Sequence, residues 1–266
     1  MSLDNLIWRC SDAAPLFTGT DGLTDAQLKK LTEYTERIEA SKEDPKKRLT
    51  DNMWVEFNDL SLRKNNFDNG IIELQKGAKT YIEKKVKEVV YGYKPAFAQN
   101  GNRYTEKGNM VEDDAINLIN MYFMKFYEKS TTHLKKGRLS GHPDVEDADE
   151  MIIVDNKSSW TKETFPALPE DIDSSLYEWQ GKLYCYLKGW RKYRLVYTLM
   201  STPEGLVPEW EGDDLHYVED LPIGLRITYV DYVLTDDEIA HIERRLAAAE
   251  KYAVEYYNKL MAKCTN

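Results

Sequence analysis

The sequence predicts an α/β protein in which a mixed β-sheet is flanked by helices. Segments with helical periodicity alternate along the chain with short segments rich in β-branched and aromatic residues. Apolar residues make up 42% of the 266 residues, which is enough for a sizeable core. We expect a helical N-terminal arm, residues 1–94, packed on a core of residues 95–266 within one compact domain.

Helices are predicted where capping patterns precede apolar residues at helical spacing. Thr24 and Gln27 form a capping box before a helix that ends at the polar stretch 41–47. A lysine-rich helix is predicted over 69–90, and the stretch 94–107, with proline and glycine, is typical of a loop. In the core, helices are predicted over 109–128, 174–190 and 235–260.

Four strands are predicted in the core from their β-branched and aromatic content: 138–141, 151–157, 194–200 and 225–234. The second begins "MIIV" and runs directly into Asp155 and Lys157. Alternate side chains of a strand share a face, so Ile153, Asp155 and Lys157 are expected to project together. The simpler interpretation is that the strand ends there and that both charges are solvated.

Two further acids favour a functional interpretation. Asp144 ends "GHPD", and a hairpin through the acidic turn that follows would bring it beside Asp155. Two adjacent carboxylates repel each other unless one is protonated or a cation bridges them, and Mg²⁺ prefers such oxygen ligands. Glu112 extends the helical stripe of Ile116, Ile119, Phe123 and Phe126; it is either a third core-facing acid or an ordinary first-turn acid.

Composition excludes several classes of protein. The three cysteines contain no CxxC pair, so a disulfide framework, a zinc site or an iron–sulfur cluster is not indicated. There is no signal-peptide pattern and no long apolar run, so a soluble protein without a membrane partner is expected. The net charge of −10 opposes binding to polyanions at long range, although basic runs at 84–87 and 135–138 could line a DNA channel.

The order of these motifs resembles the PD-(D/E)XK nuclease superfamily. A helix with "KGNMVEDDAI" comes first, then "GHPD", then "DNK", and then "QGKLY", whose Gln180 and Tyr184 match a Q-x-x-x-Y motif. The arrangement is most similar to YqaJ-type viral recombination exonucleases and to lambda-exonuclease-like enzymes. The resemblance implies a restriction-endonuclease-like core and covers about residues 105–200, with a looser match at "WRCSD" near the N-terminus.

The resemblance also implies roles for particular residues. Glu112, Asp144, Asp155 and the backbone carbonyl of Asn156 would hold Mg²⁺, replaceable by Mn²⁺, in a two-metal site. Lys157 would be the catalytic lysine, and Gln180 would hydrogen-bond near the scissile phosphate. Tyr184 and Ser158 would contact DNA. Arg9 and Ser11 would form a pocket for the 5′-phosphate. Asp155 stands where the family more often has Glu.

The expected function is therefore metal-dependent hydrolysis of linear double-stranded DNA from a 5′ end, leaving 3′ single strands for phage-type homologous recombination. The resemblance implies a trimeric ring, a single-strand annealing protein as partner, and the cytoplasm of a bacterial or phage-infected cell. Three alternatives stay open: an endonuclease, a RecB-like or Cas4-like processing nuclease, and an inactive DNA-binding module. A Cas4-like enzyme is disfavoured because its cluster needs four thiolates and the chain has three cysteines.

Overall fold

The computed structural model describes residues 2–94, 102–173, 175 and 177–264. The chain divides into two compact units, each built from two stretches of sequence. The sheet unit comprises Met1–Pro15 and Lys84–Ile239, and the helical unit comprises Leu16–Glu83 and Ala240–Asn266. The border expected at residue 94 stays a prediction, and the adjoining residues 95–101 lie outside the described part of the chain.

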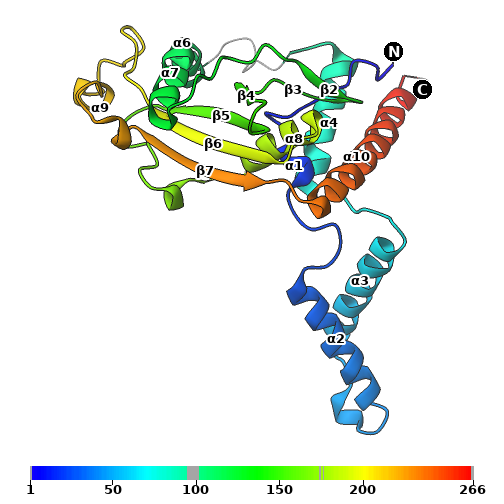
Figure 1. Cartoon of the computed structure of the whole chain (residues 1–266). Helices are drawn as coiled ribbons and strands as arrows, with labels where there is room; N and C mark the ends of the chain where they lie inside the picture. Colours follow the sequence, from blue (N-terminus) through cyan, green and yellow to red (C-terminus); the bar gives the residue numbers. More distant parts are fainter. Residues whose placement is uncertain (1, 95–101, 174, 176, 265–266) are drawn as a thin grey trace. The chain divides into compact units, whose positions relative to one another are not determined.

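A four-stranded mixed sheet, in the order β4-β5-β6-β7, is the centre of the sheet unit (Figure 1). Its central pair, β5 (Ile152–Ser159) and β6 (Lys192–Leu199), is parallel, whereas β4 (Val145–Asp147) and β7 (Ile227–Val233) pair antiparallel at the edges. A smaller sheet has the order β1-β3-β2, with β1 (Trp8–Arg9) parallel and β2 (Leu134–Lys136) antiparallel to β3 (Leu139–Gly141). The predicted mixed α/β class is confirmed.

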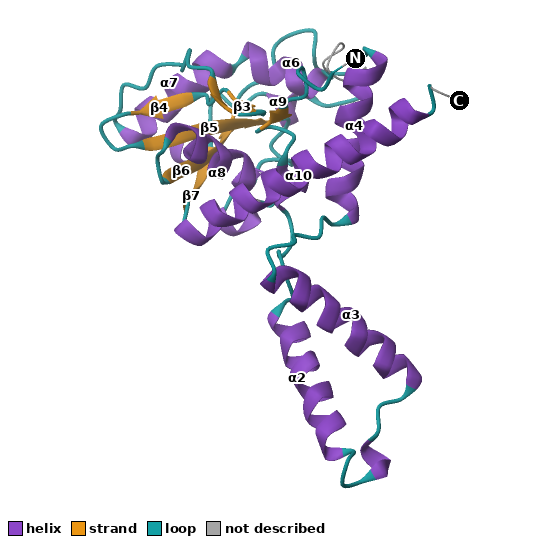
Figure 2. Ribbon diagram, turned by 90° about the vertical axis from the view of Figure 1, so that its right-hand side faces the viewer, coloured by secondary structure: helices purple, strands orange, loops and turns teal. Residues whose placement is uncertain are grey.

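Helices cover both faces of the larger sheet, as Figure 2 shows. On one face α7 (Glu112–Phe123) packs Ile116 and Ile119 against Val154 and Val196. The opposite face carries α8 (Tyr177–Lys188), the crossover helix between the parallel strands β5 and β6. The active-site candidates therefore lie on a sheet whose two faces are both buried.

Three predicted helix boundaries are wrong. The helix predicted over 109–128 ends at Phe123, because Met124 takes a left-handed conformation with φ 52°, and Phe126 leaves the stripe with 98% of its surface exposed. The predicted loop 94–107 contains the start of α6 (Arg103–Met110), which Asn102 caps. The helix predicted from residue 69 begins only at Lys76, since Asn69 ends a helix that the sequence did not indicate.

The helical unit contains the predicted N-terminal helix and the long C-terminal one. The capping box of Thr24 and Gln27 is present at the start of α2. The fully buried Arg245 donates to Asp21, and this carboxylate also pairs with Arg244 and His241. The helices not yet bounded are α1 (Ala14–Phe17), α2 (Asp25–Ala40), α3 (Asp51–Asp68), α4 (Lys76–Tyr91), α9 (Asp213–His216) and α10 (Asp236–Ala262). None of the described helices combines the length and apolarity that crossing a membrane would need.

Candidate active site

A hairpin brings Asp144 to Asp155, as the sequence predicted. Strands β4 and β5 pair antiparallel with Val145 opposite Val154, which places the residue before β4 next to Asp155. The Asp144 Oδ2 atom accepts a hydrogen bond from the backbone N–H of Asn156 at 2.7 Å. The two acids are therefore held by backbone pairing rather than by flexible side chains.

The alternation of β5 directs Asp155 and Lys157 to the face covered by α8. Lys157 Nζ lies 2.6 Å from Asp155 Oδ2 and 5.0 Å from the centre of the Tyr177 ring. Asp155 is only 1% exposed, and its Oδ2 atom has no hydrogen-bond partner of good geometry among the described residues. The predicted convergence of Asp144, Asp155 and Lys157 is thus present.

The electrostatics of this group show an excess of buried negative charge. Burial, together with the nearby charge of Asp155, raises the pKa of Asp144 to about 7 against the lowering effects of Lys157 and the Asn156 N–H. Burial alone would lower the pKa of Lys157, but Asp155 and Asp144 outweigh it and raise that pKa. Lys157 consequently stays charged, and the site favours an additional cation.

Gln180 and Tyr184 occupy one side of α8 and are both buried. The Gln180 Nε2 atom donates to the Tyr184 hydroxyl at 2.9 Å, as their spacing of one helical turn allows. Gly141 of "GHPD" lets the Tyr184 ring approach, since a Cβ at this position would lie 2.5 Å from ring atom Cε1. The motifs "GHPD" and "QGKLY" therefore pack against each other.

Glu112 is the first residue of α7, at the head of its buried stripe. Lys129 Nζ lies 2.5 Å from Glu112 Oε2, and Lys129 bridges to Val145 of β4. Within the described part of the chain, no three Asp, Glu, His or Cys side chains lie close enough together to form a ready metal cage. As the side chains lie, lysines neutralise Glu112 and Asp155.

Ser158 does not join the group around Lys157. It lies on the α7 face of β5, where its hydroxyl is 3.2 Å from that of Thr198 and accepts a bond from Asn156 Nδ2 at 3.1 Å. Thr198 in turn donates to Asn156 Oδ1 at 2.8 Å. These three side chains tie β5 to β6 directly behind the candidate catalytic residues.

The N-terminal segment lies in the same unit as the motifs. Strand β1 runs parallel to β3, with Arg9 opposite Ser140, and so adjoins the strand that leads to Asp144. Arg9 and Ser11 are both exposed. Exposure is compatible with the expected phosphate contacts, which stay predictions.

Two lysines near the site had no recognisable signal in the sequence. Lys129 pairs with Glu112, and Lys107, only 1% exposed, donates to the backbone carbonyls of Ser159 and Trp160 at 2.8 Å each. Burial lowers the pKa of Lys107 to about 8. Because lysines are rarely buried, the sequence provided no reason to place Lys107 in the interior and not on the surface.

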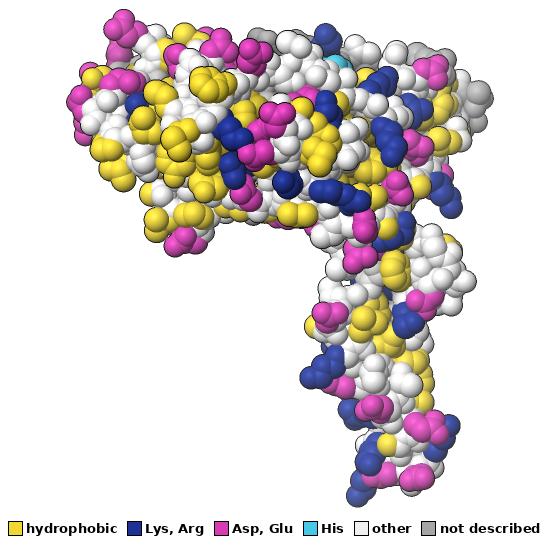
Figure 3. All heavy atoms as spheres, viewed as in Figure 1, with side chains coloured by type: hydrophobic (Ala, Val, Ile, Leu, Met, Phe, Trp, Pro, Cys, Tyr) yellow, Lys and Arg dark blue, Asp and Glu magenta, His cyan; other side chains and the backbone are white. Residues whose placement is uncertain are grey.

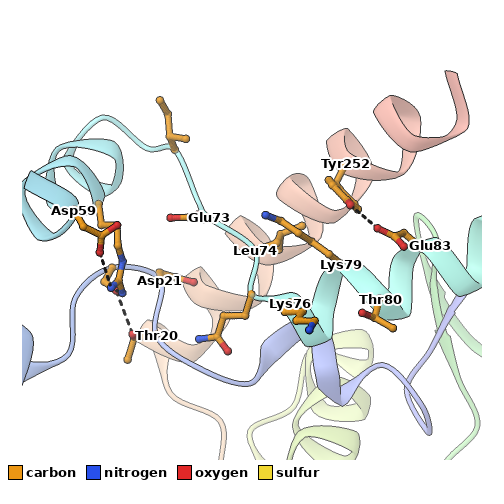
Figure 4. A pocket seen from close by; sticks show the side chains of 14 residues that line it. Thr20, Asp21, Asp59, Glu73, Leu74, Lys76, Lys79, Thr80, Glu83 and Tyr252 are labelled. Atoms are coloured by element: carbon orange, nitrogen blue, oxygen red, sulfur yellow. Dashed lines mark hydrogen bonds and ion pairs between the residues drawn. The ribbon is translucent and has the colours of Figure 1, made fainter. Parts of the chain in front are cut away.

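A cavity of about 750 Å³ lies in the helical unit, with Asp59, Glu73, Lys79, Glu83 and Tyr252 in its lining (Figure 4). Its lining contains none of the motif residues. On the face of the molecule that Figure 3 shows, basic and acidic side chains are mixed rather than gathered into one basic stripe. Neither feature competes with the β4–β5 group as the candidate active site.

Comparison with solved structures supports the same assignment. A phage-related exonuclease from Haemophilus somnus 129PT is similar at TM-score 0.66 and 27% identity, over 76% of this chain and 89% of its own. An alkaline exonuclease from Laribacter hongkongensis is similar at TM-score 0.51 and 14% identity, over 74% of this chain and 89% of its own, and supports the fold alone. The same enzyme in complex with dAMP is similar at TM-score 0.50 and 15% identity, over 72% of this chain and 87% of its own.

No protein-family model matches the chain, and no curated protein matches it. The assignment therefore depends on the order of the motifs, on the site that the fold builds from them, and on the solved exonuclease structures. On these grounds the chain is similar, in its fold and in the order of its motifs, to nucleases of the PD-(D/E)XK type such as the phage-related exonuclease.

Proposed function

We propose that this chain is a metal-dependent DNA exonuclease that degrades one strand of linear double-stranded DNA from its 5′ end. The observation that carries the proposal is the convergence of Asp144, Asp155 and Lys157 at the β4–β5 hairpin. Similarity to a phage-related exonuclease over 76% of the chain supports the reaction class.

The residues at the hairpin fit a divalent cation. The carboxylates of Asp144 and the buried Asp155 lie beside the ammonium of Lys157, which leaves surplus negative charge, and burial together with the charge of Asp155 raises the pKa of Asp144. Asp144, Asp155, Glu112 and the Asn156 carbonyl would supply the oxygen ligands that Mg²⁺ or Mn²⁺ prefers. When bound, a pair of such ions activates water and stabilises the leaving oxygen in phosphodiester hydrolysis.

Lys157 supplies a fixed positive charge beside the reacting phosphate. Its ammonium stays protonated because the neighbouring carboxylates raise its pKa, and contact with Asp155 fixes its position. A preorganised cation stabilises the negative charge that grows on the phosphoryl oxygens in the transition state. Gln180, held by Tyr184, is proposed to orient the scissile phosphate or the attacking water.

The proposed direction and partners follow from the family resemblance. Exposed Arg9 and Ser11 would bind the 5′-phosphate of a DNA end. The expected DNA contacts of Tyr184 and Ser158 are not proposed, because Tyr184 is buried against Gln180 and Ser158 lies on the α7 face of β5. The released 3′ strand would pass to a single-strand annealing protein in the cytoplasm of the host cell. The active form would be a trimeric ring, which sedimentation equilibrium would test.

The decisive experiment is a time course on end-labelled duplexes, with and without a 5′-phosphate, in Mg²⁺ and in EDTA. We expect mononucleotides released from the 5′ end in Mg²⁺, faster from phosphorylated ends, and no release in EDTA. Covalently closed circular DNA should stay intact. Cutting of the circle would replace the exonuclease proposal with the endonuclease alternative.

Substitution of Lys157 tests the mechanism. Lys157→Ala should lower kcat by about 10²- to 10³-fold, because loss of one preorganised charge at the reacting group has an effect of that order. The matched control is Lys64→Ala, whose lysine forms only a surface pair with Asp68 and should leave the rate unchanged. Unaltered hydrolysis by Lys157→Ala would refute the catalytic role of this lysine.

A further inference from the structure

An aromatic cluster lies where β5 ends, beyond Lys157. Its centre is Arg103, whose guanidinium carbon lies 5.0 Å from the Trp160 ring, 5.3 Å from the Tyr104 ring and 5.6 Å from the Trp210 ring. The Tyr104 and Trp160 rings meet edge to face with their centres 5.0 Å apart. One cation therefore holds together three rings that come from three separate segments.

Hydrogen bonds centred on Glu211 fix the loop that carries Trp210. Its carboxylate accepts from Trp160 Nε1 at 2.8 Å and from Arg103 at 3.1 Å, and it lies 2.9 Å from His216 Nε2. His216 is buried, and its other ring nitrogen lies 2.9 Å from the Thr202 hydroxyl. The position of Trp210 is thus determined by its neighbour in sequence.

The outer rings of the cluster face solvent. Trp210 is 80% exposed and Tyr104 is 49% exposed, whereas Trp160 is only 8% exposed and serves packing. The indole ring of Trp210 could gain free energy by packing on the apolar surface of the cluster beside it. It stays exposed instead. A nucleic-acid base can stack on an aromatic ring whose position is fixed and whose face is exposed to solvent.

The cluster is directly linked to both halves of the candidate active site. Helix α6, which carries Arg103, leads into α7, which begins with Glu112. Trp160 follows Lys157 by three residues, or about 10 Å along an extended chain. Lys107 bonds the Ser159 and Trp160 carbonyls, which fixes the cluster to the end of the catalytic strand.

We propose that Trp210 and Tyr104 form a stacking platform for an unpaired base of the DNA strand bound at the active site. This inference rests on the proposed nuclease function and adds a substrate contact to it. The exposed acids Glu209, Asp213 and Asp214 beside the platform do not attract phosphates, so the contact proposed here is with a base face and not with the backbone. Stacking on an aromatic ring tolerates any base, as an exonuclease needs.

The test is a double-mutant cycle between protein and DNA. Binding of a fluorescein-labelled duplex with frayed ends is measured by anisotropy in EDTA, with single abasic sites placed at each of the first six nucleotides. Trp210→Ala should weaken binding about tenfold, and Trp210→Phe by less than about threefold. At one position, removal of the base should weaken binding to wild type by the same factor and have no further effect on Trp210→Ala.

Phe126→Ala is the matched control, because Phe126 is 98% exposed beyond the far end of α7 and should bind as wild type does. Equal binding by Trp210→Ala and wild type, or additive penalties at every abasic position, would overturn the platform while leaving hydrolysis intact. Failure of the wild-type protein to bind or cleave any DNA would instead overturn the proposed function, and the platform with it. Where Trp210→Ala folds poorly, the same cycle is measured with Trp210→Leu, and absence of any position-specific abasic penalty in wild type would by itself overturn the platform.

Discussion

Gly181→Ala is a small change with a large expected effect. Gly181 lies in α8 between Gln180 and the strands, and a Cβ there would lie 2.1 Å from atoms Cε1 and Cζ of the Tyr193 ring. Carbon atoms in contact are normally about 3.5–4.0 Å apart. The Tyr193 ring would therefore have to move by about 1.5 Å.

The ring has little room for such a movement. Tyr193 is fully buried, and it stacks on Tyr232 with the ring centres 5.8 Å apart. Overpacking of this kind costs about 1–3 kcal/mol, whereas alanine in place of glycine favours a helix by at most about 1 kcal/mol. We expect the free energy of unfolding to fall by about 1 kcal/mol, which lowers Tm by about 2–4 °C in a chain of this size.

Thermal unfolding followed by circular dichroism measures this difference, with Gly108→Ala as the matched control. Gly108 also lies in a helix, but a Cβ there meets nothing within 4 Å, so the same substitution should leave Tm unchanged or raise it. A Gly181→Ala protein as stable as the Gly108→Ala protein would refute the argument. Nuclease activity should fall with Gly181→Ala, because displacement of α8 moves Gln180.

Two further predictions concern buried charges. The pKa of Asp144 is raised to about 7 by burial and by Asp155, so the folded protein in EDTA should lose stability as the pH rises from about 4 to about 7. Asp144→Asn should remove this loss, making the variant more stable than wild type at pH 8 and similar to it at pH 4 in thermal melts, while nuclease activity disappears. Asp21→Asn should lower the free energy of unfolding in urea by about 3–5 kcal/mol, because it leaves the fully buried Arg245 without its ion-pair partner. The same change at the exposed Asp59 should alter it by less than about 0.5 kcal/mol, and a loss as large as that of Asp21→Asn would contradict the burial argument.

Local patterns correctly predicted four of the strands, β3, β5, β6 and β7, and the central pair of charges, but not the short strands β1, β2 and β4. Alternation along β5 is a property of any extended chain, so Asp155 and Lys157 had to share a face. The acidic turn between "GHPD" and "MIIV" allowed only a short connection, and the hairpin with Asp144 opposite Asp155 follows from it. These inferences needed no knowledge of distant contacts.

Helix ends and the partners of the lysines near the site could not be predicted in the same way. Met124 ends α7 in a left-handed conformation that its residue type does not indicate, and Phe126 is therefore exposed instead of buried. Lys107 and Lys129 look like surface lysines in the sequence, and each gains its role from segments far away along the chain. These contacts depend on how helices and strands pack in the tertiary structure, which local sequence patterns do not specify.

The sequence by itself determined the order of the motifs, the class of the fold and the face of β5 on which the chemistry lies, because these depend on short-range periodicity and residue type. Only the tertiary structure decided that β1 joins β3, that Gly141 and Gly181 admit the rings of Tyr184 and Tyr193, and that Trp210 is held beside Trp160. The physical reason is that close packing and burial are set by residues far apart in the chain, whereas alternation and capping are set by neighbours.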